Sequence, residues 1–186
     1  MDTYDDFNLE LFSKEKAEGV KFSPYEHMKN LLELTKDYCE AFPDNPKPNF
    51  LFYGTSGLGK SFLASCICSR LSERGFNVVK VNAFKLIDDF KAMHLDKTPY
   101  PVDYFNCDFL VIDDIGTEPT YNNITQEYLF SLVNERIENK KAILFITNQN
   151  YDNTVARYDE RLASRIFDNI ITTPIRFIGS NLRMKR

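Results

Sequence analysis

The sequence has few of the residues that build a structural metal site or a disulfide framework. It contains four cysteines and two histidines in 186 residues, and no Cys-x-x-Cys pair. His27 and His94 lie far from the cysteines in the sequence, so we expect no zinc site. We expect Cys66, Cys68 and Cys107 to be small core residues with free thiols, as in the reducing cytoplasm.

Long apolar runs and an excess of positive charge are also absent. No stretch approaches the ~20 apolar residues of a membrane-spanning helix, and the acidic start M-D-T-Y-D-D does not resemble a signal peptide. A net charge of −4 argues against a chain that coats nucleic acid by bulk electrostatics, although it leaves room for a local basic site. We expect a cytoplasmic protein with no membrane partner.

Length and composition indicate one domain with a buried core. Hydrophobic residues make up 43% of the chain and charged residues 27%, which is ordinary for a globular protein. Residues 1–22 are polar and weakly patterned, so we expect a flexible N-terminal lead-in. Residues 23–186 are expected to form the domain.

Apolar runs alternate with amphipathic segments along this domain. The expected strands are 50–53, 77–82, 107–113, 142–147 and 174–178. The expected helices are 24–41, 60–74, 83–94, 122–139, 152–157 and 159–168. The apolar runs are too continuous for a half-solvated sheet, so the pattern predicts an α/β fold with a three-layer parallel sheet. Ligands of such sheets bind at the carboxyl ends of the strands.

A complete phosphate-binding loop follows the first of these strands. The motif G-x-x-x-x-G-K-S and the residue after it comprise Gly54, Thr55, Ser56, Gly57, Leu58, Gly59, Lys60, Ser61 and Phe62. The glycines let backbone N–H groups point at phosphates, Lys60 neutralises the terminal phosphates, and the Ser61 hydroxyl holds Mg²⁺. A helix that begins near Lys60 adds the positive end of its dipole. The loop therefore predicts binding of a nucleoside triphosphate, ATP, together with Mg²⁺.

Two acidic residues end the third expected strand. A carboxylate at the tip of a buried strand is costly unless it has a role there. Asp113 is expected to hold Mg²⁺ directly or through water, as a Walker B acid does. Asp114 is expected to polarise the attacking water as a general base, with Glu118 as the second choice. The alternative is that these acids merely start a turn before Gly116.

Polar residues also follow the fourth strand and line one helix. The amide of Asn148 can hydrogen-bond the γ-phosphate and the lytic water, the role called sensor 1, although Asn at this place is often only a turn former. Arg161 and Arg165 lie four residues apart, on one helix face. Arg165 is the first choice, and Arg161 the reserve, for an arginine finger that completes the site of a neighbouring subunit. The alternative is a solvated face.

The residues around these positions resemble those of a known family. L-V-I-D-D-I-G-T-E (110–118), I-T-N (146–148) and E-R-L-A-S-R-I (160–166) are similar to those of bacterial replicative helicase loaders of the DnaC/DnaI type. These are AAA+ ATPases related to the initiator DnaA, and the resemblance covers about residues 20–186. It implies an AAA+ P-loop domain with little or no helical lid, in which Arg183 is a sensor-2-like candidate.

The same resemblance implies an activity and partners. The expected activity is Mg²⁺-dependent ATP hydrolysis, stimulated by assembly or by DNA, in a replication protein that delivers the replicative helicase to single-stranded DNA. The expected neighbour is a second copy of the chain or another AAA+ subunit.

Three alternative functions fit the same motifs. One is a transposition helper ATPase of the IstB type, which shares the core and acts on a transposase and DNA. Another is a nucleotide-gated adaptor with negligible hydrolysis, because Asp114 stands where many relatives carry glutamate. A metabolic P-loop kinase is less favoured, since no lid or acceptor pocket is evident between the strands.

Overall fold

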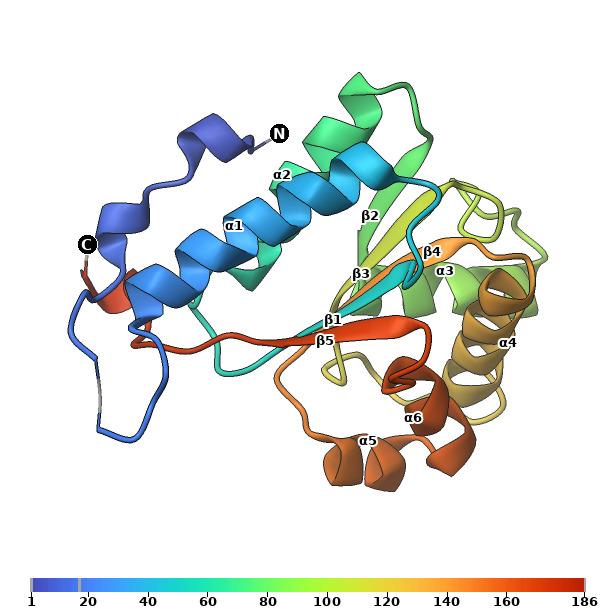
Figure 1. Ribbon diagram of the computed structural model, residues 1–186. Helices are drawn as coiled ribbons and strands as arrows, with labels where there is room; N and C mark the ends of the chain where they lie inside the picture. The colour runs from blue at the N-terminus through green and yellow to red at the C-terminus, as the bar shows by residue number, and fades with distance from the viewer. Residues whose placement is uncertain (1, 17, 186) are drawn as a thin grey trace.

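A five-stranded parallel sheet forms the centre of the structure, a computed structural model that describes residues 2–16 and 18–185 (Figure 1). Its strands, in spatial order, are β2 (Val78–Asn82), β3 (Phe109–Ile115), β4 (Ala142–Thr147), β1 (Asn49–Tyr53) and β5 (Thr172–Arg176). The predicted parallel α/β fold is confirmed. Met1 and Ala17 of the expected lead-in and Arg186 of the expected domain lie outside the described residues.

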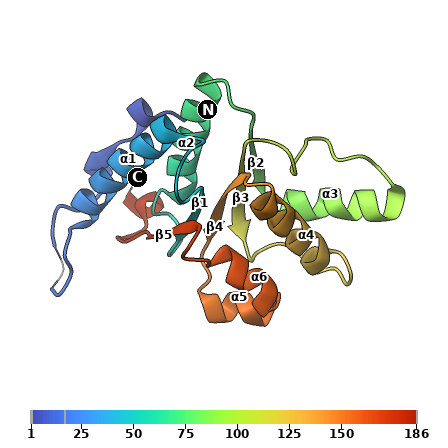
Figure 2. The ribbon, with the colours of Figure 1, turned by 45° about the vertical axis from the view of Figure 1, so that its right-hand side comes forward.

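Helices cover both faces of the sheet and produce two hydrophobic cores. On one face lie α1 (Pro24–Ala41) and α2 (Lys60–Glu73), and on the other lie α3 (Ala83–Asp96), α4 (Thr125–Glu138), α5 (Tyr151–Arg157) and α6 (Glu160–Ile166). Figure 2 shows α3 extending beyond the edge of the sheet. The described helices include none that is long and apolar enough to cross a membrane.

The third strand begins two residues later than its apolar pattern predicts. Cys107 precedes β3 and lies in a turn, where its thiol donates to the Tyr104 carbonyl oxygen at 3.8 Å. Asp108 next to it accepts a hydrogen bond from the Asn77 backbone N–H at 3.0 Å, so pairing with the neighbouring strand starts only at Phe109. The expectation of buried, free thiols is confirmed, since Cys39, Cys66, Cys68 and Cys107 are all fully buried and unpaired with one another.

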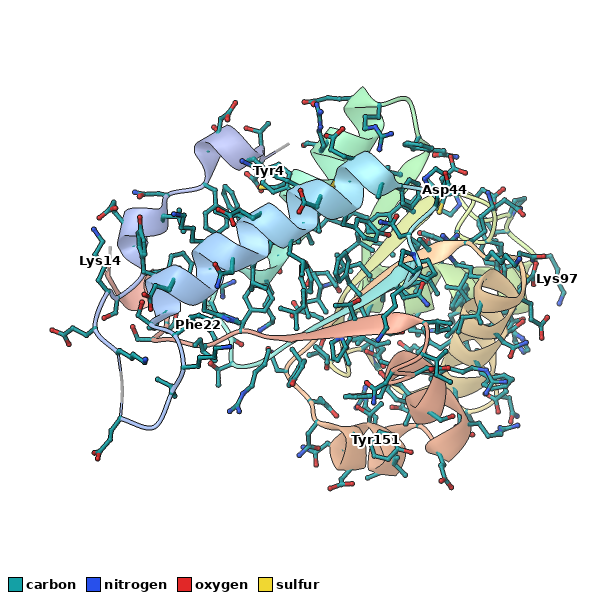
Figure 3. All side chains as sticks on the ribbon, in the orientation of Figure 1. Tyr4, Lys14, Phe22, Asp44, Lys97 and Tyr151 are labelled. Carbon is teal, nitrogen blue, oxygen red and sulfur yellow. The ribbon has the colours of Figure 1, made fainter. Side chains whose placement is uncertain are left out.

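The lead-in packs along the domain. It contains two short 3₁₀ turns, η1 (Tyr4–Asp6) and η2 (Leu9–Leu11), followed by Phe12, which is buried in the same core cluster as residues of α1. Figure 3 labels Tyr4, whose hydroxyl lies 3.8 Å from the Cys39 Sγ atom of α1. These contacts give the segment a defined place, whereas its expected flexibility stays a prediction.

Candidate functional site

The phosphate-binding loop joins β1 to α2 at the carboxyl edge of the sheet. Gly54, Gly57 and Gly59 all have positive φ angles, of +130°, +78° and +89°, which only glycine adopts without strain. A Cβ atom on Gly54 would also lie 2.7 Å from the Phe177 carbonyl oxygen. The helix starts at Lys60, so the N–H groups of its first turn face the interior of the loop.

The Lys60 ammonium group lies at the centre of this loop. Its Nζ atom donates to the carbonyl oxygens of Gly54 (2.6 Å) and Thr55 (2.7 Å) and to Oδ1 of Asn148 (2.8 Å). The Asn148 amide in turn donates to the Ser56 hydroxyl at 3.1 Å. Since β4 pairs with β1, the residue after β4 reaches the loop directly. Burial lowers the pKa of Lys60, and the nearby carboxylates oppose that shift.

Ser61 and Asp113 form a second pair beside the lysine. The Ser61 hydroxyl donates to Oδ1 of Asp113 at 3.1 Å, and the Asp113 side chain is only 13% exposed. Burial raises the pKa of Asp113, while Ser61 and a nearby lysine act in the opposite direction. A hydroxyl and a carboxylate oxygen suit Mg²⁺, which is usually held by one or two carboxylates plus substrate phosphates. The described residues contain no cluster of three or more acidic, His or Cys side chains that could hold a metal ion.

A bulge in β3 places two consecutive acids next to the phosphate-binding loop. Pairing with β4 is regular up to Ile112 and resumes at Ile115, so Asp113 and Asp114 lie in the irregular part. Asp114 has a φ of +58°, in the left-handed region. In a regular strand these side chains would point to opposite faces, whereas a bulge redirects one of them. As a result Asp113 contacts Ser61 and Asp114 lines the cavity next to the loop.

Lys80 is a site residue that the sequence analysis missed. From β2, its Nζ atom lies 3.9 Å from Oδ2 of Asp113 and donates to the Ser61 carbonyl oxygen (3.0 Å) and the Ser65 hydroxyl (2.7 Å). The available signal was a single lysine inside the apolar run N-V-V-K-V-N (77–82).

A cavity of about 730 Å³ opens beside the loop, between the two ends of the chain. Its lining comes from the lead-in, the loop, the ends of β3 and β4, and the C-terminal segment: Asp6, Phe7, Asn8, Leu11, Phe12, Ser56, Gly57, Gly59, Lys60, Ser61, Phe62, Asp114, Asn148, Leu182 and Arg183. The volume is in the range of small-molecule sites. Leu182 N–H donates to the Gly57 carbonyl oxygen at 2.9 Å, which fixes the C-terminal segment to the loop.

Glu118, the second choice for general base, is engaged elsewhere. Its side chain is buried and accepts from the Gly116 N–H at 2.8 Å. Its other oxygen lies 3.4 Å from Arg157 Nε and accepts from the Tyr158 hydroxyl. Glu118 therefore stabilises the turn after β3 and does not line the cavity, which contradicts its reserve role.

Arg161 and Arg165 lie on α6, outside the cavity. Arg165 Nε donates to Oδ1 of Asn134 on α4 at 2.8 Å. Arg161 forms an ion pair with Asp159, with 2.9 Å between Nη2 and Oδ2. The structure brings together the loop, Asp113, Asp114, Asn148 and Arg183, and it leaves both candidate fingers on a separate surface.

Comparisons with known proteins give the sequence relatives of this chain. Residues 33–173 match the family model for the bacterial DnaA ATPase domain. The replicative helicase loader DnaC of Escherichia coli strain K12 is 30% identical over 143 residues, which are 74% of this chain and 57% of the relative. The chain thus spans less than two thirds of the length of that relative.

Solved structures give the same architecture. A crystal structure of the DnaC helicase loader has a TM-score of 0.71 at 19% identity and covers 91% of this chain and 95% of its own. The replication initiator DnaA, bound to AMPPCP and single-stranded DNA, has a TM-score of 0.64 at 25% identity and covers 96% of this chain and 52% of its own. The fold is that of an AAA+ P-loop domain.

Proposed function

Because the chain belongs to the bacterial DnaA ATPase-domain family, whose members are AAA+ ATPases, we propose that it is the ATP-hydrolysing domain of a replicative helicase loader. The observation that carries this proposal is the convergence of four side chains beside the cavity: Lys60 bonds Asn148, and Ser61 bonds Asp113. The partners we propose are the replicative helicase and single-stranded DNA. Similarity to DnaC, and to a DnaA structure described as bound to single-stranded DNA, supports them.

The phosphate-binding loop and the two ends of the chain contact different parts of the nucleotide. The loop N–H groups and Lys60 hold the phosphates, and Lys60 exchanges its carbonyl contacts for phosphate oxygens. The aromatic and aliphatic side chains of Phe7, Phe12 and Leu182 provide an apolar surface for the base. Arg183 lies close enough to lower the pKa of Lys60, and we assign it to the phosphates as a sensor-2-like group.

Hydrolysis requires a base and a group that orients the water. We assign these roles to Asp114, at the edge of the cavity, and to Asn148, which contacts Lys60. Ser61 and Asp113 would hold Mg²⁺, which would supply positive charge to the phosphates. Arg165 of a neighbouring subunit supplies the remaining positive charge.

The test is ATP hydrolysis by the wild-type chain with Mg²⁺, with and without single-stranded DNA and a replicative helicase. Lys60→Ala should abolish nucleotide binding, as measured by calorimetry, because the phosphates lose their central cation. Asp114→Asn should bind ATP with near wild-type affinity and lose at least about 100-fold in turnover, the range of general-base catalysis. Glu118→Gln is the matched carboxylate control, and its turnover should not fall selectively while ATP binding is kept.

Two outcomes would contradict the proposal. Absence of phosphate release above background in a single turnover, despite tight ATP binding, would identify a nucleotide-gated adaptor. Binding to a transposase, with no binding to the helicase, would identify a transposition helper.

A further inference from the structure

The ring of Phe130 on α4 lies against two guanidinium groups of α6. The Cζ atom of Arg165 is 4.5 Å from the ring centroid, and that of Arg161 is 5.0 Å from it. Both distances are within the ~6 Å at which a cation is attracted to an aromatic face. One half-buried ring therefore contacts both candidate fingers.

The two arginines differ in what compensates their charge. Arg161 forms an ion pair with Asp159 and is 67% exposed. Arg165 has only neutral partners, Oδ1 of Asn134 at 2.8 Å and the Arg161 carbonyl oxygen at 3.2 Å. In the parts of the chain that the structure describes, no carboxylate lies within ion-pair distance of Arg165, and its Nη2 atom donates to no acceptor. Arg165 thus keeps an uncompensated charge and an open donor edge.

We propose that Phe130 is a positioning residue that holds the Arg165 guanidinium ready for the phosphates of a neighbouring subunit's site. This inference rests on the proposed ATPase function and its arginine finger. A long arginine side chain loses rotamer freedom when it meets an anion, and a group held beforehand loses less. Phe130 restrains the plane of the guanidinium, and Asn134 restrains its rotation through Nε.

A ring suits this task better than a carboxylate. A carboxylate partner would neutralise the arginine and would have to be released before a phosphate is bound. The ring face attracts the cation without offering a hydrogen-bond acceptor, so the donor edge stays available for bidentate contact with phosphate oxygens. Arg161, paired with Asp159, lacks this advantage, which favours Arg165 as the finger.

The positioning is measurable in the single chain by NMR of the arginine Nε–Hε groups. A guanidinium stacked on the ring should show a ring-current shift of its Hε resonance in the wild type. Phe130→Leu should move the Arg165 resonance toward the ordinary position, and Phe130→Tyr should preserve the shift. Unchanged Arg165 resonances in a folded Phe130→Leu protein would overturn the contact.

The functional part needs complementation between two defective chains. An acceptor with Arg165→Ala keeps its loop and lacks the finger, whereas a donor with Lys60→Ala lacks nucleotide and keeps the finger. Mixing them should restore hydrolysis in the acceptor's sites. A donor with both Lys60→Ala and Phe130→Leu should restore about fivefold less turnover, the factor of an exposed cation–π contact, at unchanged KM. Replacing Leu by Tyr at position 130 of that donor should recover the activity.

The mixtures test the finger in trans and the positioning role of Phe130 separately. If the Lys60→Ala donor restores nothing, the finger in trans is wrong, and Phe130 has no such role. If both donors restore hydrolysis equally, the ATPase and its finger stand, and only the positioning role of Phe130 is overturned.

Discussion

Lys80 connects three parts of the site that are far apart in the sequence. Its ammonium group donates to Ser61 and Ser65 of α2 and lies beside the largely buried Asp113. A carboxylate at such a depth needs a cationic or hydrogen-bonding partner, because desolvation otherwise favours its neutral form. Lys80 therefore stabilises the charged form of Asp113, the acid that we assign to Mg²⁺.

We expect Lys80→Met to destabilise the nucleotide-free protein by about 1–3 kcal/mol, since it leaves polar groups at the site without a partner. Urea unfolding measures this free energy, and Lys80→Arg should restore part of it. Lys29→Met, at an exposed position of α1, is the control and should change stability by less than about 0.5 kcal/mol. Equal stabilities for the Lys80→Met and wild-type proteins would show that these contacts contribute nothing.

Among the helices, α1 has a complete start signal. The Ser23 hydroxyl accepts from the Glu26 N–H at 3.2 Å, and the Glu26 carboxylate accepts from the Ser23 N–H at 2.9 Å, which is a capping box. Pro24 occupies the first helical position. The hydrogen bonds from Ser23 lower the pKa of Glu26.

Ser23→Ala should lower the free energy of unfolding by about 1 kcal/mol at pH 7, because the helix loses its N-cap. The Glu26 contribution should depend on pH. It is complete above the ordinary glutamate pKa and is lost as the pH falls through the lowered folded-state pKa.

The stability difference between wild type and Glu26→Gln should therefore shrink toward zero below about pH 4. Chemical denaturation across pH 3–7 measures it. Glu33→Gln, at an exposed position further along α1, is the matched control. A difference that does not change with pH would exclude the charged capping interaction.

At the scale of the whole molecule, residues near both ends of the chain line the cavity to which we assign the nucleotide. Phe7 of the lead-in stacks on Phe12 (5.9 Å between centroids) and meets Phe62 of α2 edge-on (5.4 Å). On the C-terminal side, Leu182 bonds the loop at Gly57. Figure 1 shows the C-terminal turn beside the lead-in. We therefore expect the affinity for the nucleotide to change when the lead-in or the C-terminal segment is displaced.

We expect Phe7→Ala to weaken ATP binding by about three- to tenfold, because the cavity loses an aromatic wall worth roughly 1 kcal/mol. Calorimetric titration with a non-hydrolysable analogue gives the Kd. Leu9→Ala is the control, since Leu9 packs on the same core and does not line the cavity. If both variants bind equally well, the lead-in has no part in the base site.

The sequence alone predicted the features that depend on short motifs and on the succession of elements along the chain. The phosphate loop, the alternation of strands and helices, and Asp113, Asp114 and Asn148 at strand ends all follow from spacing along the chain. Parallel strands carry such residues to one edge, so their proximity was predictable without coordinates. The bounds of β4 agree residue for residue, because all of its side chains are buried.

Only the tertiary structure decided which groups meet across distant segments. Lys80 reaches Asp113 because β2 pairs with β3. Glu118 pairs with Arg157 of α5 instead of lining the cavity. The contact of Arg165 with Phe130 and the lining of the cavity by both chain ends depend on how helices and termini pack. Packing is a sum of many non-local contacts, and no short-range pattern encodes it.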